Sequence, residues 1–190
     1  MLDNGSYGVQ DLTNMDVVVR HPEFRDWVLS IAVSNTGLLA TGGLLNKVYI
    51  WVQETGDLLH TIHPTSPAEF VTGQFHVAFH PTLPYFGHLE PDGTVSVVET
   101  LSWKPIASLA DSEDEAVEFA FDPCLPRIAI GTQSGALLIW DIAQHASVAR
   151  FRGRGLPYTL SFSADSSLLA VVSDDGSCLI HATNSGAVVH

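Results

Sequence analysis

A strand-turn-strand cassette recurs four times along the chain, and this repetition strongly limits the folds that the sequence can adopt. Each copy is an apolar strand that follows a short polar turn: NKVYIWV at 46–52, GTVSVVE at 93–99, ALLIWDI at 136–142 and GSCLIHA at 176–182. The corresponding positions near the end of each copy are separated by 47, 42 and 41 residues. A fixed period of this size, with four short strands in each repeat, indicates stacked four-stranded sheets.

A second position reports the same period. The apolar strand that opens each repeat ends at Val33, Phe79, Phe121 or Phe162, and these residues are 46, 42 and 41 positions apart. We therefore predict an all-β fold in which antiparallel four-stranded sheets form the blades of a β-propeller. The blades are expected at about 21–62, 74–109, 115–151 and 157–190, within a repeat region that spans 16–190.

The N-terminal residues carry no such periodicity. Residues 1–15 are polar and rich in glycine and asparagine, so we expect a flexible lead-in. The short β-branched run VVVR at 17–20 predicts an isolated strand, which we interpret as the outermost strand of a further blade.

Composition and charge exclude several classes of function. The net charge is −13, with 21 acidic residues against 8 lysines and arginines, so binding to nucleic acid or to an anionic membrane is disfavoured. The same charge favours partners with basic segments, although it also serves solubility alone. The chain has two cysteines, no secretory signal and no apolar run of roughly 18–20 residues, which indicates an intracellular protein of the cytoplasm or nucleus.

Several segments resemble the WD-repeat family of β-propellers. The similarity is carried by FSADSSLLAVVSDDG at 162–176, ALLIWD at 136–141, LLATGG at 38–43 and PDGTVSV at 91–97, and it extends over about 21–190. The resemblance implies a non-enzymatic scaffold that binds protein partners. It also implies a buried network of His, Ser or Thr, Asp and Trp in each blade. Every repeat lacks at least one member: the first has His21, Thr41 and Trp51, the second Asp92, the third Thr132 and Trp140, and the fourth Ser173 and Asp175.

The number of repeats leaves the closure of the propeller open. The family usually closes with about seven blades, and this chain holds four. We expect an incomplete, open propeller. Such an arc leaves two end faces uncovered, an exposure that folded proteins avoid, so three ways of covering these faces follow. The chain is part of a longer propeller of about seven blades, or it associates with a second copy or a partner, or it closes a strained four-bladed ring.

Acidic residues are expected to gather on one edge of the propeller. The run DSEDE at 111–115 connects two repeats, and such connections share an edge with the turns between second and third strands. We predict a partner-binding surface for a basic segment there, and a merely solvated loop is the alternative. Its residues are Asp111, Glu113, Asp114, Glu115, Asp92, Asp174 and Asp175, with Arg152 and Arg154 one loop away. Trp103 is a separate candidate for an exposed aromatic anchor, and packing in the core or at a blade edge is the equal alternative.

The sequence carries no recognisable catalytic motif. It contains no Gly-x-Ser-x-Gly elbow and no phosphate-binding loop of the Gly-x-x-x-x-Gly-Lys type. His76 and His80 lie on one strand face about 13 Å apart at roughly 3.3 Å per residue, too far to share a metal. We expect no cofactor, no metal and no enzymatic activity. The alternative is an enzyme or small-ligand binder that uses the central channel, where the first strands begin at Trp27, Gln74, Glu115 and Pro157.

Overall fold

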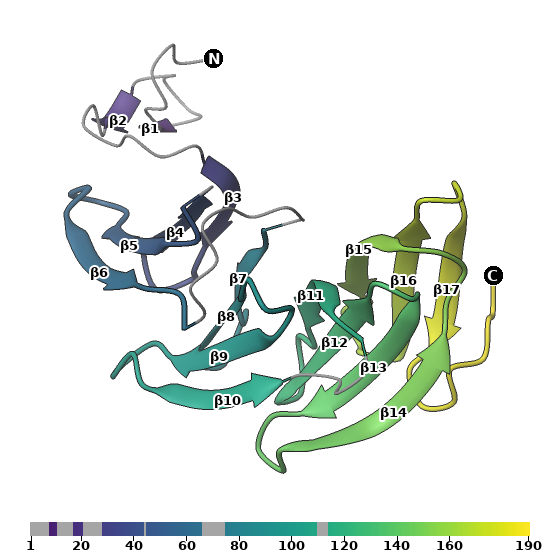
Figure 1. Ribbon diagram of the computed structural model, residues 1–190. Helices are drawn as coiled ribbons and strands as arrows, with labels where there is room; N and C mark the ends of the chain where they lie inside the picture. The colour runs from purple at the N-terminus through teal and green to yellow at the C-terminus, as the bar shows by residue number, and fades with distance from the viewer. Residues whose placement is uncertain (1–7, 11–16, 21–27, 44, 66–74, 110–113) are drawn as a thin grey trace.

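The fold consists of strands alone in the part of the chain that the structure describes. The computed structural model describes residues 8–10, 17–20, 28–43, 45–65, 75–109 and 114–190. Four antiparallel sheets follow one another around an open arc, with their first strands toward the inside and their last strands toward the outside (Figure 1). This arrangement confirms the predicted all-β, open-propeller architecture.

Each sheet is one blade, and its strands follow one another in chain order. Blade 1 contains β3 (Val28–Val33), β4 (Leu38–Gly43), β5 (Val48–Val52) and β6 (Leu58–Ile62). Blade 2 contains β7 (Val77–Phe79), β8 (Tyr85–Leu89), β9 (Val95–Glu99) and β10 (Pro105–Leu109). Blade 3 contains β11 (Ala116–Phe121), β12 (Arg127–Thr132), β13 (Ala136–Asp141) and β14 (Ala146–Arg152). Blade 4 contains β15 (Pro157–Phe162), β16 (Leu168–Ser173) and β17 (Cys178–Ala182).

The two ends of the chain differ from the expected pattern. The fourth strand expected at the end of the last blade (157–190) is reduced to one bridge between His181 and Val188, together with backbone bonds such as Ile180 N to His190 O at 3.0 Å. At the other end β2 (Val17–Arg20) is not isolated but pairs with β1 (Gly8–Gln10), which lies inside the segment expected to be a lead-in. Pairing satisfies backbone groups that a lone strand would leave without partners.

The turns between second and third strands share one conformation. Gly93, Gly135 and Gly176 have φ angles of 77°, 85° and 79°, in the left-handed region that favours glycine. Asn46 holds the equivalent place in blade 1 with φ 59°. Asparagine tolerates this region better than most residues, which explains how a turn without glycine keeps the same repeat geometry.

Most of the hydrophobic core lies between blades, and one small cluster around Leu39 and Trp51 lies within blade 1. One cluster joins blades 1 and 2 through residues such as Ile50 and Val77, and a second joins blades 2 and 3 through Val97 and Phe119. A third joins blades 3 and 4 through Leu137 and Leu160. Because strand residues alternate between faces, each blade covers its predecessor with one face and its successor with the other. We call these the leading face and the trailing face.

The polar network that the family resemblance implies is present only in part. In blade 1 the indole Nε1 of Trp51 donates to Thr41 Oγ1 at 3.0 Å. In blade 3 the hydroxyl of Thr132 instead bonds the backbone of Ala136, and the buried Nε1 of Trp140 has no hydrogen-bond partner among the residues described. His181 stands where blade 4 would have the tryptophan, and its Nδ1 bonds Gly186 O at 3.0 Å. His21 lies outside the described residues.

One edge of the arc carries a hydrogen-bond series that links each blade to the next. At the turns between first and second strands, Asn35 Nδ2 donates to Pro81 O at 2.7 Å, and Thr82 Oγ1 donates to Pro123 O at 3.4 Å. Cys124 Sγ donates to Ala164 O at 3.2 Å. The three acceptors hold the same place in successive repeats, so polar contacts repeat with the period of the apolar ones.

The inter-blade core yields a direct stability prediction. Phe119 on β11 is 1% exposed and packs against blade 2, so Phe119→Ala should lower the free energy of unfolding by about 3–5 kcal/mol through lost burial and a residual cavity. Leu101→Ala is the matched control, because that side chain is 82% exposed, and its effect should stay within about 0.5 kcal/mol. Urea denaturation measures both, and equal losses would contradict the inter-blade core.

Candidate functional site

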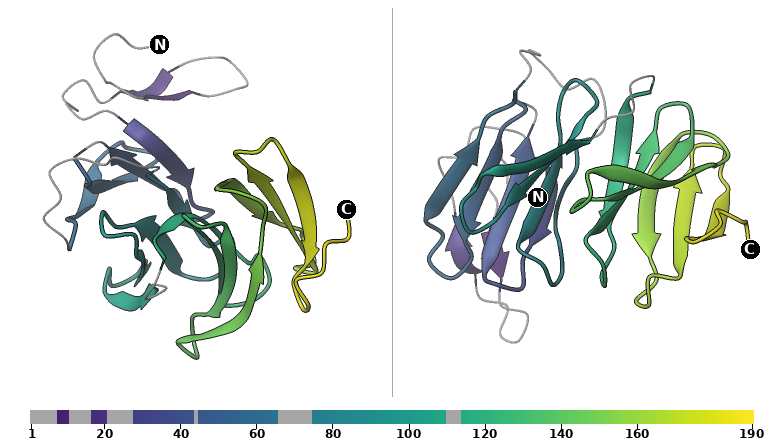
Figure 2. Two further views of the ribbon diagram at one scale, coloured as in Figure 1. Left: turned by 45° about the vertical axis from the view of Figure 1, so that its right-hand side comes forward. Right: turned by 90° about the horizontal axis from the view of Figure 1, so that it is seen from below.

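The acidic residues singled out from the sequence lie along one edge of the arc, on turns and loops that are bonded to one another. Strands run from this edge to the opposite one and back (Figure 2), so inter-blade loops meet the turns between second and third strands. Ala116 N donates to Gly93 O at 2.9 Å, and Gln133 N donates to Glu115 O at 2.8 Å. We call the described acids of this edge the acidic rim: Asp92, Asp114, Glu115, Asp174 and Asp175.

Asp92 and Glu115 come from different blades and lie close together. Asp92 Oδ1 accepts from Thr94 N at 3.1 Å and from its hydroxyl at 2.8 Å, which fixes the turn between β8 and β9. The next residue, Gly93, abuts Glu115, because a Cβ added to the glycine would lie 2.6 Å from Glu115 Cβ. Both acidic side chains are exposed. The two acids therefore lie on contacting loops at the junction of blades 2 and 3.

Asp114 holds the adjoining turn of blade 3. Its Oδ1 accepts from Ser134 N at 3.1 Å, and its Oδ2 accepts from the Ser134 hydroxyl at 2.5 Å. Burial alone would raise the pKa of Asp114, but these hydrogen bonds, with one from Thr132 and the charge of Arg150, bring it below its usual value. The carboxylate is thus ionised at neutral pH and partly engaged by its own fold.

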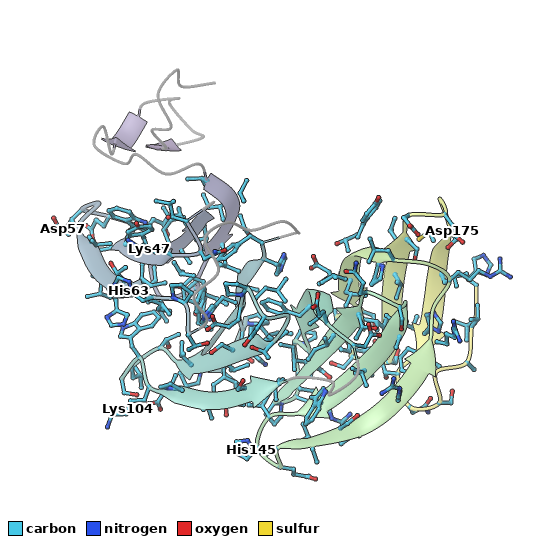
Figure 3. All side chains as sticks on the ribbon, viewed as in Figure 1. Lys47, Asp57, His63, Lys104, His145 and Asp175 are labelled. Carbon is cyan, nitrogen blue, oxygen red and sulfur yellow. The ribbon has the colours of Figure 1, made fainter. Side chains whose placement is uncertain are left out.

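Asp174 and Asp175 form the corresponding part of the rim on blade 4. Asp174 Oδ1 accepts from Leu156 N at 2.9 Å, so the carboxylate caps the loop between blades 3 and 4. Asp175 is exposed and labelled in Figure 3. Hydrogen bonds from Ser177 lower the pKa of Asp175, and the nearby charge of Arg154 lowers it further. Blade 4 therefore carries two neighbouring acidic side chains, one of which lies near Arg154.

The remaining predicted residues do not join the acids directly. Arg152 ends β14 opposite Ala136 and is exposed. Trp103 lies in the turn between β9 and β10, on the opposite edge, and it is half-buried and not an exposed anchor. Its ring stacks on His60 with centroids 5.3 Å apart and meets Phe86 edge-on at 6.3 Å, which places it between blades 1 and 2. Asp111, Glu113, Trp27 and Gln74 lie outside the described residues.

Two pairs of titratable residues, each with a buried glutamate, escaped the sequence analysis. His76 Nδ1 lies 3.3 Å from Glu118 Oε1, between blades 2 and 3. His88 Nε2 lies 3.1 Å from Glu90 Oε1, and Glu90 Oε2 accepts from Thr65 N. Burial raises the pKa of Glu90, but the bonds from His88 and Thr65 outweigh it and lower the pKa overall. The packing of blades 2 and 3 brings His76 and Glu118 together, which no short motif in the sequence reports, whereas His88 and Glu90 are two residues apart in the chain.

The His76–Glu118 pair is neutral around neutral pH. Burial raises the pKa of Glu118 to about 8 and lowers the pKa of His76 to about 4, because both charged forms lose hydration between the blades. Strongly shifted groups are candidates for chemistry as well as for structure. Among the described residues, however, no group of three His, Cys, Asp or Glu side chains is placed to hold a metal ion. In the same residues no helix has the length and apolar character of a membrane span.

These shifts predict a specific pH dependence of stability. Between pH 4.5 and 6.5 the pair binds one proton in the folded state, on Glu118, and one in the unfolded state, on His76. The free energy of unfolding is therefore independent of pH in this range. Between pH 6.5 and 8 only the folded state keeps the Glu118 proton, so the free energy of unfolding should fall by about 2 kcal/mol. Glu118→Gln should abolish this fall, whereas the exposed neighbour variant Glu115→Gln should retain it. Denaturation series across the pH range measure it, and a fall that survives Glu118→Gln would contradict the assignment.

Comparisons with known proteins agree with the repeat and the fold. The family described as "WD domain, G-beta repeat" matches residues 146–181, which run from β14 to β17. The matched repeat therefore begins with the last strand of blade 3 and ends with the third strand of blade 4. Pre-mRNA-processing factor 19 homolog 2 of Arabidopsis thaliana is 33% identical over 104 residues, which are 53% of this chain and 20% of that protein.

Two further similarities cover most of the chain. WD repeat-containing protein SL1-17 of Schistosoma mansoni is 27% identical over 164 residues, which are 85% of this chain and 52% of that protein. This chain therefore spans about half of one curated relative and a fifth of the other. The β-propeller domain of Cps50 (Swd1) from Myceliophteria thermophila superposes with a TM-score of 0.79 at 16% identity, over 94% of this chain and 59% of that one. The successive blades and the superposition show a β-propeller fold, and the matched repeat and the named relatives support a WD-repeat propeller.

Proposed function

We propose that the chain is a non-catalytic scaffold whose acidic rim binds a basic segment of a partner protein. WD-repeat propellers generally bind protein partners and generally lack catalytic activity. The observation that carries the finer proposal is the clustering of Asp92, Glu115 and Asp175 with Asp114 and Asp174 on bonded loops of three successive blades. Carboxylates held in fixed positions favour a complementary cationic partner.

The fixed geometry of the rim supports binding more strongly than its charge alone. Asp114 and Asp174 use their carboxylates to hold the loops that carry Glu115 and Arg154. The exposed carboxylates are therefore preorganised, and a partner loses little free energy in ordering them. Arg154 beside Asp175 gives blade 4 a mixed-charge end, so we propose that the basic segment lies chiefly over blades 2 and 3.

The net charge of −13 favours a protein partner over nucleic acid, because phosphates would be repelled. We further propose an intracellular setting, in the cytoplasm or the nucleus. The name of the Arabidopsis relative connects that protein with pre-mRNA processing, and this favours the nucleus.

Neutralising the rim should weaken binding of a cationic probe. The double variant Asp92→Asn with Glu115→Gln removes two charges and keeps the acceptor that fixes the β8–β9 turn. Its affinity for fluorescein-labelled oligolysine at low salt should fall about three- to tenfold, and the salt dependence should become shallower. Fluorescence anisotropy measures both quantities.

The matched control carries the same charge change on the opposite edge. Glu54 and Asp57 are exposed acids of the turn between β5 and β6, and Figure 3 labels Asp57 on blade 1. Glu54→Gln with Asp57→Asn should leave oligolysine binding within about twofold of the unaltered chain. Equal losses in both double variants would mean that net charge, and not the rim, attracts the probe, and would contradict the proposal.

A further inference from the structure

On the edge opposite the acidic rim, the ring of His80 fills the junction between blades 2 and 3. His80 is buried, and the centroid of its ring lies 5.3 Å from that of Phe121 on blade 3. Its Nδ1 accepts from the backbone N–H of Thr82 at 3.1 Å and of Leu83 at 3.0 Å, which assigns the proton to Nε2. That nitrogen donates to Leu125 O at 3.1 Å. The chain thus closes this junction with an aromatic ring and one cross-blade hydrogen bond.

Blade 1 carries a serine at the position of this histidine. Ser34 N donates to Leu38 O just as His80 N donates to Tyr85 O, so the two residues hold the same place in successive turns. The Ser34 hydroxyl accepts from the N–H of Thr36 at 3.2 Å and of Leu38 at 2.8 Å. It therefore closes its own turn, as Nδ1 of His80 does, but in the described part of the chain it makes no bond to blade 2.

Two more positions leave room at the junction of blades 1 and 2. Leu38 stands at the place of Tyr85. Thr100 stands at the place of Ile142, because each donates its N–H to the proline that precedes the second strand of its blade. Ile142 is fully buried, whereas Thr100 is half-buried. A hollow of about 250 Å³ results, and its lining includes Ser34, Leu38, Phe79, Leu83, Thr100 and Leu101.

The walls of this hollow offer an aromatic ring and a carbonyl oxygen. Phe79 is the equivalent of Phe121, as strand pairing shows. Leu83 O is the equivalent of Leu125 O, and each accepts from the N–H two residues further on. A carbonyl oxygen has a second lone pair, and among the described residues no side chain of blade 1 donates to that of Leu83. Leu101 is 82% exposed, so an apolar group that enters the hollow also removes part of it from water.

We propose that this hollow binds the indole ring of a tryptophan in a partner protein, with the indole N–H donating to Leu83 O. The ring takes the place that His80 fills at the next junction. Indole is a donor only, whereas an imidazole also needs a donor for its second nitrogen. The turn amides that would supply one, those of Thr36 and Leu38, are already bonded to Ser34. The volume is below that of sites for drug-sized ligands, and tryptophan is enriched among interface anchors.

N-Acetyl-tryptophanamide is a neutral probe for this site. In a 1H–15N NMR titration of the full chain, the amide signals of Leu83, Thr100 and Leu101 should shift and saturate with a roughly millimolar Kd. The analogue methylated at the indole nitrogen cannot donate and should bind about three- to tenfold more weakly. N-Acetyl-tyrosinamide should also bind more weakly, because its smaller ring buries less surface. Absent shifts at these amides, equal affinity for the methylated analogue or tighter binding of the tyrosine analogue would overturn the proposal.

Two variants fill the hollow in different ways. Ser34→His supplies the ring of the next junction, and Thr100→Ile supplies its isoleucine. Each should weaken probe binding at least about fivefold while the circular dichroism spectrum is retained. Ser147→His adds the same ring on exposed β14 and should stay within about twofold. The rim variant Asp92→Asn with Glu115→Gln should also bind the probe normally, which separates this site from the acidic rim. Binding that survives both filling variants, or that Ser147→His weakens equally, would contradict the assignment.

Discussion

The packing of each blade's leading face on the trailing face of the blade before it determines the rest of this structure. A four-stranded meander has two apolar faces and cannot bury both alone, so its stability depends on its neighbours. Three of the four hydrophobic clusters of the described residues lie between blades, and each of these three joins two successive repeats. Close approach is part of this contact, because Gly87 of blade 2 lies against the ring of Phe119 of blade 3.

The polar features of the molecule follow from this apolar stacking. Once blades are in register, turns of successive repeats meet at both edges of the arc. One edge gains the series of bonds to Pro81, Pro123 and Ala164 carbonyls, and the other gains the acidic rim. Stacking also buries a polar side chain wherever a repeat carries a polar residue at an inter-blade position. Glu118 is one of these, and its raised pKa connects stability to pH through the same blade interface that holds the core.

The architecture was predictable from the sequence because spacing survives when individual residues change. Val98 and His181 replace the tryptophan of their repeats, yet the strands form at the expected places. The shared edge of Asp92 and Glu115 was predictable for the same reason, since alternating strand direction decides it. The burial and contacts of individual side chains were harder to predict from the sequence. The sequence left Trp103 open between an exposed anchor and a packed side chain, and its ring packs on His60 of blade 1. The His76–Glu118 pair depends on how strands of different blades pack together. Such contacts between repeats leave no short-range pattern.

A double-mutant cycle across one blade interface tests the central role of this stacking most directly. A Cβ on Gly87 would lie 2.8 Å from the Phe119 ring, so Gly87→Ala should destabilise the unaltered chain by about 1–3 kcal/mol through overpacking. In the Phe119→Leu background the smaller side chain leaves room, and Gly87→Ala should then cost clearly less. The account predicts a coupling free energy of at least about 1 kcal/mol from denaturation of the four proteins. Additive effects would show that the two blades do not pack face to face at this point, and would contradict the account.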